Sequence, residues 1–262
     1  MSLPALIDNV TKELMAMPQS SCNVVHYFAP GICVREVTMP AGTFAVGHRQ
    51  KFDHLNVFLK GRVRMFDELT GETSEISAPL IYVGKPGRKV GYIMEDMVWQ
   101  NIYATDLTDP DAVEDHFIDK QHGFAEYADL HRPEHNDGDY EQMLADVGYT
   151  AEQVEKESQI DSDIMPFPFG AVSVQIGLSK IHGKGLFATS DMKAGHMIPA
   201  RINGNRTPAG RYVNHAKTPN CAPILIHGDI YFMLKNDVNG NRGGLLGDEL
   251  TVDYREVYRI AR

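Results

Sequence analysis

Three short segments in the C-terminal part of the chain carry the side chains and spacings best suited to chemistry. They are 182–188 (His-Gly-Lys-Gly-Leu-Phe-Ala), 211–220 (Arg-Tyr-Val-Asn-His-Ala-Lys-Thr-Pro-Asn) and 247–254 (Gly-Asp-Glu-Leu-Thr-Val-Asp-Tyr). Gly183 and Gly185 let the backbone come close to a ligand, because glycine has no side chain. The Asn214 amide both donates and accepts hydrogen bonds, which suits a zwitterionic group. The segments therefore predict a ligand site assembled from distant parts of the chain.

Each segment taken alone also has an ordinary structural explanation. Asn214-His215 is consistent with a polar turn that closes two strands. Tyr254 is consistent with a core aromatic residue at the end of a strand. What favours a common site is that the three segments occur in a fixed order within 182–254.

Together the segments resemble the signatures of SET-domain protein-lysine methyltransferases. Those signatures are a GxG strand pair, an R-[FY]-[IV]-N-H-x3-P-N segment and a G-[DE]-E-[IL]-T-x-D-Y ending, and the resemblance covers about 175–258. It implies a SET-type fold and S-adenosylmethionine as the cofactor. It also implies that Tyr254 supplies the catalytic phenol, that Tyr212 lines the site, and that the cofactor is bound by Gly183, Lys184, Gly185, Asn214 and His215.

Methyl transfer to lysine requires a neutral amine in line with an activated methyl group. The sulfonium is already activated, so such a protein mainly binds, aligns and presents the amine. Free lysine has a pKa near 10.4 and is almost fully charged at pH 7. A dry, narrow channel favours the uncharged amine, and a phenol oxygen can hold it in line.

Two features depart from the family pattern. Gly185 and Asn214 are only twenty-nine positions apart, whereas typical SET enzymes carry a longer insert that walls the peptide groove. Asn203-Gly204 stands where an upstream Tyr-x-Gly segment is expected. These departures keep open a second hypothesis, in which the chain is a catalytically degenerate structural or interaction protein that retains its folds.

The N-terminal part predicts a small β domain. A helical stripe of apolar residues spans 3–16, and short β-type runs cut by Gly and Pro fill 23–105. The spacing Gly42-x5-His48-x-Gln50-x3-His54-x6-Gly61 resembles the first cupin motif in every interval and implies a cupin-like β-barrel. Gln50 and His54 replace the family's metal-binding His and Glu, so we expect no catalytic metal. Hydrogen-bonded strand histidines are the alternative for His48 and His54.

The chain is therefore predicted to be mainly β, with three parts. These are a cupin-like barrel with its N-terminal helix (1–105), an acidic helical connector with a Pro/Phe linker (106–170) and a minimal SET-like domain (171–262). A capping box at Thr150 and Gln153 begins one connector helix. His131 and His135 are expected in a loop, since Pro133 lies between them. Strands of the last part are expected at 172–176, 185–188, 197–199, 222–226 and 230–234.

Composition limits the partners. The formal net charge of −10 argues against sequence-independent nucleic-acid binding. Neither a signal peptide nor a membrane span is expected, and three cysteines without paired spacing fit a reducing compartment. A barrel followed by a short SET module resembles hypothetical proteins of tailed bacteriophages. It implies a location in the host cytoplasm or virion, a protein substrate or a virion or host protein as partner, and a possible homo-oligomer.

Overall fold

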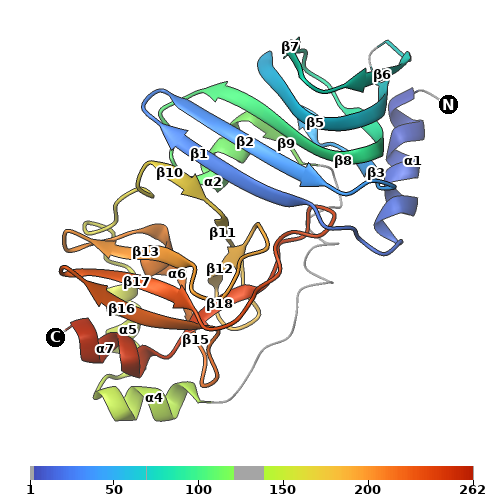
Figure 1. Ribbon diagram of the computed structural model, residues 1–262. Helices are drawn as coiled ribbons and strands as arrows, with labels where there is room; N and C mark the ends of the chain where they lie inside the picture. Colours follow the sequence, from blue (N-terminus) through green and yellow to red (C-terminus); the bar gives the residue numbers. More distant parts are fainter. Residues whose placement is uncertain (1–2, 69, 121–138, 262) are drawn as a thin grey trace. The chain divides into compact units, whose positions relative to one another are not determined.

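The computed structural model describes residues 3–68, 70–120 and 139–261 and is mainly β (Figure 1). His131 and His135 lie outside the described residues. The chain forms two compact units, each drawn from more than one stretch. Unit 1 comprises Met1–Leu130, Phe169–Ser173 and Gly240–Leu246, and unit 2 comprises His131–Pro168, Val174–Asn239 and Gly247–Arg262. None of the helices described is both long and apolar enough to span a bilayer.

Unit 1 is built on an antiparallel eight-stranded sheet. Its hydrogen-bonded order is β10 (Gly170–Val172), β1 (Asn23–Ala29), β2 (Ile32–Met39), β8 (Lys89–Ala104), β5 (His54–Asp67) and β6 (Thr73–Ser77), with β3 (Phe44–Val46) on β8 and β7 (Leu80–Gly84) on β5. A second, two-stranded sheet joins β4 (Arg49–Gln50) to β9 (Ile118–Asp119). The long strands β5 and β8 form the centre, visible as the paired ribbons in Figure 1.

Local sequence explains where these strands begin and end. Gly87, with a φ of 126°, sits in the turn between β7 and β8. The Asp67 carboxylate accepts a hydrogen bond from the Thr70 amide in the turn between β5 and β6. The predicted N-terminal helix is confirmed as α1 (Leu3–Met15). Side chains alternate between two faces along each strand, and Phe58, Val63, Ile93 and Met97 form a buried hydrophobic cluster on one of them.

The prediction of a mainly β chain is confirmed, but a closed barrel is not seen in the described residues. The outermost strands of the main sheet, β10 and β6, each pair on one side only. Barrel closure requires hydrogen bonds between the first and last strands. Strands β10 and β6 make none with each other in the described pairing.

Unit 2 contains two four-stranded sheets. One has the order β11 (Val174–Leu178), β12 (Lys184–Ala188), β18 (Glu249–Val252) and β15 (Asn214–His215); the other has β14 (Asn205–Arg206), β13 (Met197–Ile202), β17 (Asp229–Leu234) and β16 (Cys221–Ile226). All five strand ranges expected in this part of the sequence overlap observed strands. Strands β14, β15 and β18 were not predicted, because a strand of two to four residues shows too little hydrophobic periodicity.

Helices of unit 2 follow clear end signals. They are α4 (Tyr140–Val147), α5 (Ala151–Ser158), α6 (Pro208–Tyr212) and α7 (Tyr254–Ala261), while α2 (Pro110–Phe117) belongs to unit 1. Gly148 ends α4 in the left-handed conformation with φ 76°. The predicted capping box is confirmed: the Thr150 hydroxyl accepts from the Gln153 amide, and the Gln153 side chain accepts from the Thr150 amide.

A buried ion pair connects α2 to the sheet of unit 1. Arg35 of β2 donates from Nε to Oε1 of Glu114 at 2.9 Å, and Lys120 Nζ lies 3.3 Å from the other carboxylate oxygen. Burial opposes ionisation of Glu114, but the neighbouring charges, Arg35 first, outweigh it and hold its pKa well below the usual range. The carboxylate is therefore charged inside the fold and must keep its partners.

His26 of β1 is fully buried next to this pair. Its Nε2 lies 4.0 Å from Glu114 Oε1, and neither ring nitrogen has a hydrogen-bond partner among the described residues. Burial lowers the pKa of His26 to about 4, with Glu114 opposing the shift. The folded protein therefore holds a neutral imidazole where the unfolded chain would take up a proton.

We predict that this histidine makes unit 1 acid-sensitive. Unfolded His26 binds a proton near pH 6.5 and folded His26 only near pH 4, so its contribution to stability is complete above pH 6.5 and is lost as the pH falls toward 4. The difference corresponds to about 3 kcal/mol. Urea unfolding of wild type and His26→Phe between pH 7 and 4 measures it. The variant should lose this part of the pH dependence, and identical profiles would place the acid-sensitive group elsewhere.

Candidate functional site

The three chemistry-bearing segments meet in one sheet of unit 2. Strand β12 contains Lys184 and Gly185, β15 is Asn214–His215, and β18 ends at Val252, two positions before Tyr254. Strands β12 and β18 pair antiparallel, whereas β15 lies parallel to β18 with Asn214 opposite Thr251 and His215 opposite Val252. A parallel pair needs a crossover connection, here supplied by β16 and β17. The crossover brings the second and third segments side by side.

Asn214 ties the first segment to the other two. Its side-chain amide nitrogen lies 3.1 Å from the carbonyl oxygen of Lys184 and 3.3 Å from that of His182. It also lies 2.8 Å from Oε1 of Glu249. Asn214 is buried, so these bonds are shielded from water. The amide protons thus hold the 182–184 backbone against β18.

Glu249 is the acceptor at the centre of this arrangement. Besides Asn214, it accepts from the Ser179 hydroxyl at 2.7 and 2.9 Å, and that hydroxyl also accepts from the Ile181 amide at 2.9 Å. A Cβ on Gly185 would lie 2.2 Å from Oε1 of Glu249. A larger residue at 185 would therefore displace the Glu249 carboxylate from its present position. Sequence reasoning did not assign Glu249 or Ser179 a role, because no spacing links positions seventy residues apart.

Gly183 has a different environment from Gly185. Its φ is +50°, in the left-handed region that favours glycine, and no described atom lies within 4 Å of the place where a Cβ would stand. The Gly183 carbonyl accepts from the Ser179 amide at 2.9 Å, which closes the loop upon itself. The backbone at Gly183 is thus rigidly held and open on its side-chain face.

His215 is oriented through Nδ1, whereas its Nε2 has no hydrogen-bond partner among the described residues. Nδ1 accepts from the backbone amide of Tyr254 at 3.3 Å, so the neutral ring carries its proton on Nε2. Nε2 faces Oδ2 of Asp139 at 3.4 Å. Asp139 also accepts from Arg255 at 2.7 Å, and this bond, first among the causes, keeps the Asp139 pKa below its ordinary value. The histidine is fixed in tautomer and plane.

Tyr254 begins α7 and points back to the second segment. Its hydroxyl donates to the Val213 carbonyl at 2.8 Å, and its ring centroid is 5.4 Å from that of His215. Burial raises the pKa of the phenol well above its ordinary value. The oxygen therefore stays protonated, with its proton directed at the backbone and its lone pairs available as acceptors.

Tyr212 and Lys184 lie together on the same side of the sheet. Lys184 Nζ is 5.6 Å from the Tyr212 ring centroid, and the Arg211 guanidinium carbon is 5.0 Å from it. Cations at such distances are attracted by the ring quadrupole. All seven residues predicted for the site thus belong to one unit. Direct contacts, or contacts through one neighbour, link Lys184, Asn214, His215, Tyr254 and Tyr212.

The residues at the cupin-like spacing lie in unit 1. His48 is partly buried, and the loss of solvent lowers its pKa to about 4. Gln50 accepts from the Tyr103 hydroxyl at 3.0 Å, and His54 Nδ1 is 3.1 Å from the Phe52 carbonyl oxygen. No group of three or more His, Cys, Asp or Glu side chains placed to hold a metal occurs within the described residues. Gln50 and His54 bond to the protein itself.

No protein-family model and no curated protein matches this chain. Solved structures are similar over part of it. A cupin domain from Bordetella pertussis Tohama I is 19% identical over 34% of this chain and 99% of its own, with a TM-score of 0.29. A cupin superfamily protein from Desulfitobacterium hafniense DCB-2 is 9% identical over 36% and 87%, with a TM-score of 0.27. Ectoine synthase from P. lautus is 15% identical over 40% and 80%, with a TM-score of 0.28.

We predict that Asn214→Asp destabilises unit 2 more than Asn214→Ala. Alanine removes the donated bonds, at a cost on the order of 1–3 kcal/mol. Aspartate at neutral pH adds a carboxylate that faces Glu249 and two carbonyl oxygens, which repel it. Thermal unfolding at pH 7 should rank wild type above Ala and Ala above Asp.

Asn205→Asp serves as the matched control, because Asn205 is exposed. The free energy of unfolding of this variant should stay within about 0.5 kcal/mol of the wild-type value. If Asn214→Asp proved as stable as wild type, the Asn214 amide would not be the link between these strands.

Proposed function

We propose that this chain is an S-adenosylmethionine-dependent protein methyltransferase that acts on lysine, with its site in unit 2. The observation that carries the proposal is the parallel pairing of β15 with β18. Strand β12, which contains Lys184 and Gly185, pairs with the same β18, so the three segments share one sheet. This supports a common site of the kind that the resemblance to SET-domain enzymes suggests. Chance motif matches spread over seventy residues have no reason to converge through direct hydrogen bonds.

The surroundings of Gly183 fit a cofactor. The left-handed backbone and open side-chain face of Gly183 allow a ligand to approach the main chain. Gly185 adds no side chain to the neighbouring strand position. Lys184 and Arg211 flank Tyr212 next to this loop and supply positive charge for a carboxylate. When bound, S-adenosylmethionine would supply an activated methyl group.

The chain's own residues would hold and orient the acceptor amine. The Tyr254 proton is engaged by Val213, so the phenol oxygen presents lone pairs that can accept from an amine N–H. Because its pKa is raised by burial, Tyr254 does not act as a base. With the cofactor bound, these residues would hold the neutral amine in line with the methyl group that the cofactor supplies, and the proton that the methylated amine loses would pass to solvent.

Unit 1 is proposed to be a cupin-like domain that has no catalytic metal. The Gly42–Gly61 spacing and the antiparallel strand order support this assignment. Glutamine at position 50 is a poor ligand compared with histidine, and here it is bonded to Tyr103.

A second candidate is an interaction protein, in which both folds remain and the chemistry is lost. One observation favours it: the polar groups of Asn214 and Tyr254 that a cofactor site would use are engaged by the protein itself. In this case the motif residues would serve stability alone. The proposed phage origin and the host or virion partner belong to this candidate as much as to the first.

Calorimetric titration with S-adenosylmethionine distinguishes the candidates. The methyltransferase proposal expects binding that Lys184→Ala weakens. The Lys184 side chain borders the loop, and its contact among the described residues is with the Tyr212 ring. Lys60→Ala, an exposed lysine of unit 1, should bind like wild type. If the wild-type protein does not bind S-adenosylmethionine at millimolar concentration, the methyltransferase proposal is contradicted and the interaction-protein candidate is favoured.

We predict that Tyr254→Phe lowers methyl transfer at least about a hundredfold while cofactor affinity changes little. Removing one positioned polar group from a transition state costs about 2.7–4 kcal/mol in comparable sites. Transfer of labelled methyl groups to a protein extract, with calorimetry on the same variant, measures both quantities. A variant with near wild-type turnover would remove Tyr254 from the mechanism.

A further inference from the structure

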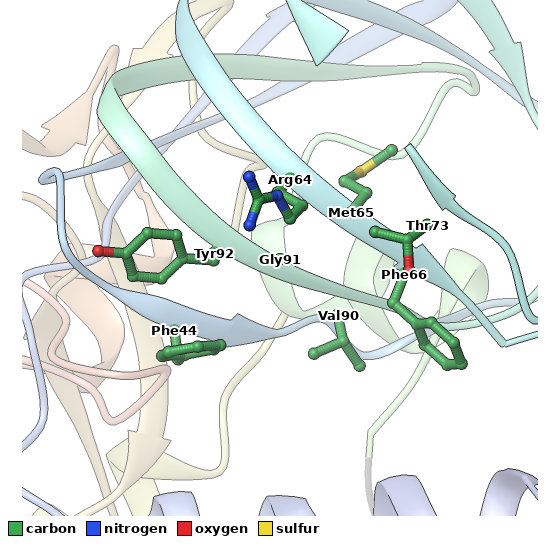
Figure 2. Close-up of a pocket in the computed structure, with 8 residues that line it drawn as sticks. All are labelled: Phe44, Arg64, Met65, Phe66, Thr73, Val90, Gly91 and Tyr92. Carbon is green, nitrogen blue, oxygen red and sulfur yellow. The ribbon is translucent and has the colours of Figure 1, made fainter. Parts of the chain in front are cut away.

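Unit 1 carries a pocket of about 470 Å³ that contains none of the residues discussed above. Four strands contribute to it: β3, β5, β6 and β8. Figure 2 shows Phe44, Tyr92 and Arg64 on one side of the pocket and Met65 and Thr73 on the other, with Val90 and Phe66 below. Its volume lies within the range of small-molecule sites, about 300–1,000 Å³.

The strand register explains why these side chains gather. Phe44 is opposite Tyr92, Tyr92 is opposite Arg64, and Arg64 is opposite Glu75. One row of side chains therefore crosses β3, β8, β5 and β6 on a single face. Two residues along, Val90 is opposite Phe66, and Phe66 is opposite Thr73. The first row is aromatic and charged, and the second is mostly apolar.

An aromatic pair remains exposed at this pocket. Phe44 is 61% exposed and Tyr92 is 37% exposed. Their ring centroids are 4.9 Å apart with an interplanar angle of 47°, a tilted contact that leaves ring faces open. Exposed aromatic rings placed beside a concavity offer stacking surface to a planar ligand.

The polar end of the same row is electrically balanced. Arg64 donates from Nε and Nη2 to Oε1 of Glu75 at 2.9 and 2.6 Å. Both side chains are half exposed; Arg64 lines the pocket, and Glu75 lies next to it in the row, outside the lining. Their charges cancel, so the row attracts neither anions nor cations strongly. The complementary group is a neutral one that both donates and accepts, such as a carboxamide.

We propose that this pocket binds a small, uncharged, planar aromatic molecule bearing an amide-type group. The ring stacks on Phe44 and Tyr92, and the amide meets the Arg64–Glu75 pair. This site is independent of the proposed methyltransferase site, since all of its residues belong to unit 1.

Ligand-observed NMR on the full chain tests the proposal with three probes. Benzamide has the ring and the neutral amide, benzoate replaces the amide with an anion, and cyclohexanecarboxamide keeps the amide but is not planar. Benzamide should bind with a Kd on the order of millimolar. The other two should bind more weakly. Equal binding of cyclohexanecarboxamide would overturn the stacking role, and tighter binding of benzoate would overturn the neutral rim.

Substitutions place the probe on the protein. Phe44→Ala should weaken benzamide binding about three- to tenfold, and Phe44→Tyr, which keeps a ring, should restore it. Ile81→Ala is the control, because Ile81 is 66% exposed on β7 and does not line the pocket. If Phe44→Ala and Ile81→Ala both bind benzamide as wild type does, the pocket is not the site.

Discussion

The Glu249 carboxylate is the acceptor on which the β11–β12–β18–β15 sheet of unit 2 depends. It receives the amide of Asn214 and the hydroxyl of Ser179, so it joins three segments that are far apart in sequence. Hydrogen bonds to a charged acceptor are about twice as strong as neutral ones, and this one lies where an additional carbon on Gly185 would collide with it. The position of the Glu249 carboxylate therefore depends on the absence of a side chain at Gly185.

Everything proposed for the chemistry of unit 2 follows from that arrangement. Because Asn214 is held against the 182–184 backbone, His215 occupies the next position of β15, where the Tyr254 amide bonds to its ring and Asp139 lies 3.4 Å away. Tyr254 in turn is held by Val213. These bonds hold the backbone segments of the site together. Such an arrangement suits the alignment of two reactants, and it also suits a purely structural module; binding of the cofactor separates the two.

Unit 1 is organised by a different constraint, the burial of charge. Glu114 stays ionised because Arg35 and Lys120 lie beside it, and His26 stays neutral because burial outweighs the attraction of that carboxylate. On the exposed face of the same unit, the charges are paired in water rather than buried: Arg64 and Glu75 form an exposed ion pair. The apolar rings of Phe44 and Tyr92 lie beside that pair, and we propose that they stack on a ligand.

The sequence by itself determined the mainly β class, the helix at 3–15, the capping box at Thr150 and the strands of unit 2 long enough to show periodicity. These features depend on neighbours close in the chain. Only the tertiary structure decided that β15 lies parallel to β18, that Ser179 and Glu249 meet, that Arg35 finds Glu114, and that the main sheet of unit 1 shows no closure. The reason is physical: such contacts join residues about forty to eighty positions apart, and their free energy depends on burial and register that no local pattern encodes.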